Sequence, residues 1–169
     1  MSNPLALNMY CLGYDSTKNL TTLNNATKEN LRTYLSEHRI LTDAINIKDA
    51  YIINIGLDFE IITRPNQNSN DVILRCIERL KQLLSSDRMQ INGPLNISNL
   101  TTELDTVSGV QSVASLEFKN LFDMDAGYSG NVYDIKTATK NGIIYPSLDP
   151  SIFEIKYPNS DITGRVVKP

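Results

Sequence analysis

The chain has 169 residues, with 16 basic and 19 acidic side chains and a net charge of -3. No run of like charges could follow a phosphate backbone, so nucleic acid is not an expected partner. No stretch approaches the roughly 18 apolar residues of a membrane span, and the start lacks the basic region and long apolar core of a signal peptide.

The first predicted element is a short strand over residues 5–11, which ends at Gly13. Its apolar positions alternate with their neighbours and are Leu5, Leu7, Met9 and Cys11. Because the sequence begins almost inside this strand, we expect Met1 to open a fragment of a longer protein.

A helix is predicted next, from a cap at Asn25 or Thr27. Its expected inward stripe has helical spacing and consists of Leu31, Tyr34, Leu35 and His38. His38 stands in the last turn, and the chain has no other histidine. We therefore interpret it as a charge partner for the helix dipole and not as a catalytic base or metal ligand.

The strongest local signal is the alternation of apolar and polar residues from Tyr51 to Thr63, which predicts a long strand with one buried face. Asp58 and Glu60 lie two apart on the other face. A carboxylate pair can perform acid–base chemistry, but a solvated sheet face is the expected explanation for these two residues.

A second amphipathic helix is predicted over Val72–Leu84. Its inward positions are Ile73, Cys76, Ile77, Leu80 and Leu84. Cys76 therefore lies on an apolar stripe, as does Cys11, and we expect two free thiols that act as small hydrophobic groups, with a disulfide as the alternative.

A third helix is predicted from a cap near Ser98 to Gly109. Its inward positions are Ile97, Leu100, Leu104 and Val107. A strand over Val113–Lys119 follows, with Ala114, Leu116 and Phe118 on one face. This order of elements predicts an α+β fold, with an antiparallel or mixed sheet and two to three helices on one side.

From about Asn120 the chain is rich in glycine and proline, and helix is disfavoured. Short strands are predicted over residues 132–135, 142–145 and 152–157. We therefore expect two domains, an α+β domain over residues 1–119 and a strand-rich C-terminal extension or small subdomain over residues 120–169.

Few residues suggest chemistry. Asp123-Met-Asp125-Ala-Gly127 is similar to the start of a calcium loop, but its glycine occupies the fifth place and not the sixth. The sequence contains no Cys-x-x-Cys, His-Glu-x-x-His, Gly-x-Ser-x-Gly or phosphate-binding glycine loop. We therefore expect no catalytic residue, no metal and no cofactor.

The segment from Leu31 to Val113 resembles the baseplate J-like family of contractile phage tails. The similarity rests on the order of its motifs, which are Leu31-Arg-Thr-Tyr-Leu35, Arg39-Ile-Leu-Thr42, the strand Tyr51–Thr63, the helix Val72–Leu84, Pro94-Leu-Asn-Ile-Ser-Asn-Leu100 and Val107-Ser-Gly-Val110. The segment Asn141–Val166 is similar to the C-terminal part of the baseplate wedge proteins of myovirus-type phages. Family members are much longer than this chain.

The resemblance implies a structural component of the virion, placed in the tail baseplate and assembled in the cytoplasm of the bacterial host. It implies pairing with itself, as a homodimer, and contact with other wedge or hub proteins. It also implies that the chain is not an enzyme. The predicted interface consists of apolar residues of the C-terminal segment, Tyr145, Phe153, Ile155, Tyr157 and Ile162. Packing of these residues on their own domain is an equal alternative.

A second functional hypothesis is a small-ligand-binding or regulatory α+β domain, and an enzyme is a third. A ligand pocket needs polar residues that converge. The sequence offers Asp58, Glu60, Arg64 and Asn66 near one end of the long strand.

Overall fold

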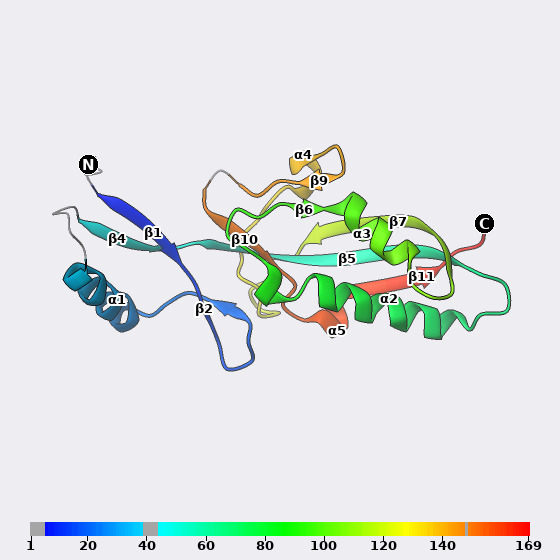
Figure 1. Cartoon of the computed structure of the whole chain (residues 1–169), viewed down its shortest axis with the longest axis horizontal. Helices are drawn as coiled ribbons and strands as arrows, with labels where there is room; N and C mark the ends of the chain where they lie inside the picture. Colours follow the sequence, from blue (N-terminus) through cyan, green and yellow to red (C-terminus); the bar gives the residue numbers. More distant parts are fainter. Residues whose placement is uncertain (1–5, 39–43, 148) are drawn as a thin grey trace. The chain divides into compact units, whose positions relative to one another are not determined.

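The computed structural model describes residues 6–38, 44–147 and 149–169. The chain divides into two compact units, residues 1–51 (unit 1) and residues 52–169 (unit 2). Figure 1 shows the elements of both, coloured along the sequence. Leu5 and the predicted Arg39–Thr42 turn lie outside the described residues.

Unit 1 contains a two-stranded parallel ribbon and one helix. Strand β1 (Leu7–Cys11) pairs with β4 (Ile45–Asp49), with Met9 opposite Ile47. Strands β2 (Gly13–Tyr14) and β3 (Leu20–Thr21) form a short antiparallel hairpin. Helix α1 (Asn25–His38) packs against β4, and Lys28 Nζ lies 2.7 Å from Asp49 Oδ2.

The inward stripe predicted for α1 is only half correct. Leu31 and Leu35 are half-buried, whereas Tyr34 is 59% exposed and His38 is exposed. No residue of α1 is fully buried. The reason is that, among the described residues of unit 1, α1 packs against a narrow ribbon, which leaves one side of its apolar stripe exposed.

Unit 2 is built around β5 (Tyr51–Thr63), the long strand that the sequence predicted. Strand β7 (Val110–Asn120) pairs with β5 antiparallel and β11 (Ile162–Val166) pairs with it parallel. Strand β10 (Ser151–Glu154) also pairs with β5. The sheet is therefore mixed, and the α+β fold class is confirmed.

Two helices cover one face of this sheet. Helix α2 (Ser69–Leu83) begins after its cap Asn68, and α3 (Ile97–Asp105) begins after Asn96. The cap of α3 is Asn96, two residues before Ser98, because its side chain accepts a hydrogen bond from the Asn99 N–H at 3.0 Å. A 3-10 turn, η1 (Ser86–Arg88), follows α2.

The core of unit 2 lies between the sheet and these helices. From β5 it takes the odd-numbered side chains Ile53, Ile55, Leu57, Phe59 and Ile61. From the helices it takes Val72, Cys76, Leu80, Leu100 and Leu104. Both cysteines are free thiols, as expected, with Cys76 buried and Cys11 half-buried.

The prediction that β5 has a single buried face is wrong for its first half. The even-numbered residues Ile52, Asn54 and Gly56 are buried as well. The segment after β7 covers them, because Ser129 N donates to Asn54 Oδ1 at 2.8 Å and Ser129 Oγ donates to the Ile52 carbonyl at 2.6 Å. Only from Asp58 onward does the second face open to solvent.

Strand β7 also departs from the predicted pattern. Its pairing with β5 shifts between Glu60 opposite Ser115 and Ile61 opposite Val113. Ala114 is therefore the extra residue of a β-bulge and is exposed, while Val113 packs against the core. The prediction that Ala114 shares one face with Leu116 and Phe118 is therefore wrong.

Residues 120–169 belong to unit 2 and do not form a separate body. Strands β6 (Leu95–Asn96), β9 (Ile143–Ile144) and β8 (Thr139–Lys140) form a small sheet, which joins this segment to the start of α3. The compact units divide after Tyr51 instead of after residue 119, because β10 and β11 pair with β5.

Two single-turn helices interrupt the C-terminal segment, in which helix was disfavoured. Helix α4 (Ile135–Ala138) is capped by Asp134, whose carboxylate accepts a hydrogen bond from Thr137 N at 3.1 Å. Helix α5 (Pro158–Asp161) starts with proline at its first position. Residues 132–134 of the predicted 132–135 strand are irregular, because the cap and α4 follow at once.

Candidate functional site

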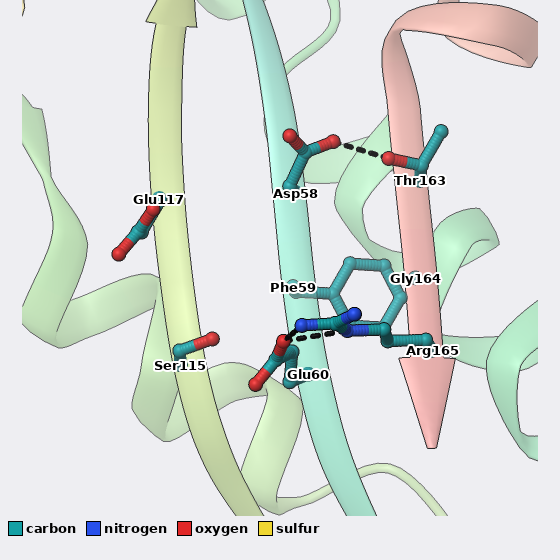
Figure 2. A pocket seen from close by; sticks show the side chains of 8 residues that line it. All are labelled: Asp58, Phe59, Glu60, Ser115, Glu117, Thr163, Gly164 and Arg165. Carbon is teal, nitrogen blue, oxygen red and sulfur yellow. Dashed lines mark hydrogen bonds and ion pairs between the residues drawn. The ribbon is translucent and has the colours of Figure 1, made fainter. Parts of the chain in front are cut away.

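The open face of the unit 2 sheet carries a polar surface, which lies opposite α2 and α3. Asp58 and Glu60 project from β5, and the facing strands add Ser115 and Glu117 from β7 and Thr163 and Arg165 from β11 (Figure 2). Pairing places Asp58 between Glu117 and Thr163, and Glu60 between Ser115 and Arg165. Together they line a shallow depression of about 690 Å³.

The charges in this depression are largely paired. Asp58 accepts a hydrogen bond from the Thr163 hydroxyl and lies 3.1 Å from Lys119 Nζ. Partial burial opposes ionisation of Asp58, but Thr163 and Lys119 outweigh it, so the pKa of this carboxyl lies below its usual value. Glu60 accepts from Arg165 through Nε and Nη2 (Figure 2).

This arrangement is suited to a solvated sheet face more than to acid–base chemistry. A general acid or base near neutral pH needs a raised carboxyl pKa, and that of Asp58 is shifted the other way. Arg64 and Asn66, the other two residues of the ligand pocket that the sequence suggested, do not line this depression. Arg64 donates from Nε to the Val110 carbonyl at 3.2 Å, and Asn66 is an exposed turn residue with φ 63°.

The remaining chemical candidates have local structural roles. His38 Nδ1 lies 2.8 Å from the Tyr34 carbonyl, and the two rings contact each other at a tilt, with centroids 4.4 Å apart, in the last turn of α1. Asp123 Oδ1 accepts from Asp125 N at 3.0 Å, which makes the calcium-like segment an ordinary turn. Among the described residues, no three His, Cys, Asp or Glu side chains cluster as a metal site would require.

The structure divides the five predicted interface residues into two groups. Phe153, Ile155 and Ile162 are buried in the core of unit 2, so they cannot offer an exposed interface in this fold. They are buried because β10 and β11 pair with β5, so that Phe153 and Ile162 on these strands, and Ile155 directly after β10, pack into the core. Tyr145 and Tyr157 remain 46% and 38% exposed.

The two exposed tyrosines lie in different surroundings. Tyr145 lines a mostly apolar depression of about 510 Å³ together with Val132, Ala138 and Pro146. Tyr157 packs edge-on against Tyr128, with ring centroids 5.5 Å apart. Burial raises the pKa of the Tyr128 hydroxyl, and so does the hydrogen bond that this hydroxyl donates to the Asp161 carboxylate.

Unit 1 carries a surface that the sequence did not reveal. In the described residues its buried apolar side chains are only Leu20, Ile47 and Ala50, whereas Leu7, Tyr14, Tyr34 and Tyr51 are exposed. Among the residues that the structure describes, strand β1 pairs there with β4 alone. Sequence alternation predicted a strand in this position but could not tell how many neighbours the strand has.

The fold defines an α+β protein whose mixed sheet is covered by helices on one face. No helix within the described ranges is long and apolar enough to span a membrane. No protein-family model and no curated protein matches the chain.

Proposed function

We propose that this chain is a structural assembly module, which pairs with itself and binds neighbouring proteins, and that it performs no catalysis. The specific form that we propose is a component of a phage tail baseplate, located in the virion and assembled in the host cytoplasm. The resemblance of Leu31–Val113 to the baseplate J-like family supports this form.

The observation that carries the proposal is the incomplete enclosure of unit 1. A two-stranded sheet is marginally stable in water, and parallel sheets are normally covered on both faces. Here α1 is the helix that packs on the ribbon, and it has no fully buried residue. A partner that adds strands or covers apolar side chains would supply the missing burial.

One of the motifs that resemble the baseplate J-like family has a clear structural role. In Val107-Ser-Gly-Val110, Gly109 has φ 95°, and a Cβ placed there would lie 2.6 Å from Val72 Cγ2. Any other residue would be strained at this turn between α3 and β7. This explains the glycine, and it is consistent with the resemblance.

The ligand-binding alternative has weaker support. The depression around Asp58 is shallow. Asp58 pairs with Lys119 and also accepts a hydrogen bond from Thr163, and Glu60 pairs with Arg165. A buried ligand site would instead offer an apolar pocket with a few unpaired polar groups.

The test is the molar mass of the full chain, measured by light scattering after size exclusion from about 1 to 100 µM. We expect a concentration-dependent dimer. A monomer at every concentration, combined with a rise in melting temperature on addition of a metabolite, would contradict the proposal and favour the ligand-binding domain.

A further inference from the structure

Strand β1 has an unpaired outer edge within the described residues. The Leu7 N–H donates to the Ala44 carbonyl at 2.9 Å, and Leu7 lies opposite Ile45. Hydrogen-bonding direction alternates along a strand, so Leu7, Met9 and Cys11 bond to β4. The N–H and C=O groups of Asn8 and Tyr10 therefore point to the outer edge.

This edge lacks the usual protection against strand addition. Natural sheets shield their edges with lysine and other charges, proline or bulges. Residues 7–11 have no charge, no proline and no register shift, whereas β4 carries Lys48 and Asp49. Leu7 is 58% exposed, although it lies on the same face of the ribbon as the buried Ile47.

We propose that a second copy of this chain adds its β1 antiparallel to the outer edge of β1, with the two-fold axis at Met9. The proposal rests on the proposed self-association and assigns the surface that mediates it. The result is a four-stranded sheet, ordered β4, β1, β1 and β4, with the two α1 helices on one face.

The sequence of β1 is compatible with this symmetric pairing. A two-fold axis perpendicular to the sheet keeps each face on its own side, so apolar residues meet apolar residues. Leu7 then faces the partner's Cys11 and Met9 faces the partner's Met9. No charge opposes a like charge, and a register centred at Asn8 or Tyr10 would pair fewer of the five residues.

Backbone direction also agrees with the register. Asn8 and the partner's Tyr10 both present their N–H and C=O groups outward, so they form the hydrogen-bonded pairs. Leu7 and the partner's Cys11 form a pair without backbone hydrogen bonds, where side chains approach most closely. A cysteine at position 7 would therefore lie within disulfide distance of the partner's Cys11.

The first experiment is mild oxidation of the full-length Leu7→Cys variant, followed by non-reducing electrophoresis. We expect a covalent dimer. The unmodified chain should stay uncrosslinked, because its Cys11 and the partner's Cys11 would stand about 14 Å apart, four strand residues, beyond the ~7 Å limit for a disulfide. Leu7→Cys combined with Cys11→Ala should not crosslink either.

Cys76 does not contribute crosslinks in this experiment. Its side chain is fully buried in the core of unit 2. Burial raises the pKa of the Cys76 thiol to about 11, which keeps it protonated and slow to react at neutral pH.

The second experiment compares Asn8→Pro with Asn8→Ala by light scattering. Proline removes the outward N–H while leaving the bonds to β4, whereas alanine removes only the side chain. We expect Asn8→Pro to weaken dimerisation at least about tenfold and Asn8→Ala to leave it nearly unchanged, with both variants retaining native circular dichroism.

The outcomes separate the two proposals. A dimer that is unaffected by Asn8→Pro and does not crosslink through Leu7→Cys would keep self-association but overturn the β1 edge as its site. An unmodified chain that stays monomeric at all concentrations, with no crosslink in the Leu7→Cys variant, would overturn both the proposed self-association and the β1 edge as its site.

Discussion

Unit 1 and unit 2 contain strands of similar local pattern, but they enclose very different amounts of apolar surface. Of 23 buried apolar side chains in the described residues, three belong to unit 1 and 20 to unit 2. Strands β4 and β5 follow each other with only Ala50 between them, yet within the described part of the chain β4 pairs with one strand and β5 with three. The comparison shows that alternation predicts a strand but not its degree of coverage.

The largest expected effect is a cavity in the core of unit 2. Leu80 is fully buried on α2, and Leu80→Ala should lower the free energy of unfolding by about 2–5 kcal/mol. Leu74→Ala is the matched control, because Leu74 lies on the same helix and is 59% exposed. Urea denaturation measures both, and equal losses would mean that α2 does not cover the sheet as described.

The second prediction compares the two units directly by amide hydrogen exchange. In dilute solution, where partner binding is negligible, amides bonded within the β1–β4 ribbon should exchange about 100-fold faster than those in the centre of β5. The cause is the small core around Ile47. Raising the protein concentration should slow exchange in the ribbon if a second copy covers it. Equal protection in both units would remove the contrast between them.

The third prediction concerns close packing between β5 and β11. Gly164 lies under the Phe59 ring, and a Cβ at position 164 would lie 2.2 Å from Phe59 Cζ. Gly164→Ala should therefore destabilise unit 2 by about 1–3 kcal/mol. The cost should shrink in a Phe59→Leu background, because the smaller side chain leaves room. Additive losses in the double variant would argue against this contact.

The smallest expected effect concerns the polar face. Thr163→Val should raise the pKa of Asp58 toward its ordinary value of 3.8, as followed by carboxyl NMR titration, while Thr163→Ser should not. The pKa of Asp58 is lower in the folded protein than in the unfolded chain. Ionised Asp58 therefore stabilises the fold above its unfolded pKa, and this contribution is lost as pH falls through its folded pKa. Because Asp58 is exposed, the effect on stability should stay below about 1 kcal/mol.

The sequence by itself determined the local elements of this protein. The alternation in Tyr51–Thr63 and the apolar stripe of Val72–Leu84 were sufficient for β5 and α2, because strand and helix periodicity arise from contacts within a few residues. The polar character of Asp58 and Glu60 was visible in the same way.

Only the tertiary structure decided what each element packs against. Pairing of Ile162–Val166 with β5 joins residues about 100 apart, and no local pattern specifies such a partner. The same holds for the bulge at Ala114 and for the burial of Phe153, which moved a predicted interface residue into the core. Non-local contacts determine pairing, bulges and coverage, because their free energy depends on neighbours that are distant in the sequence.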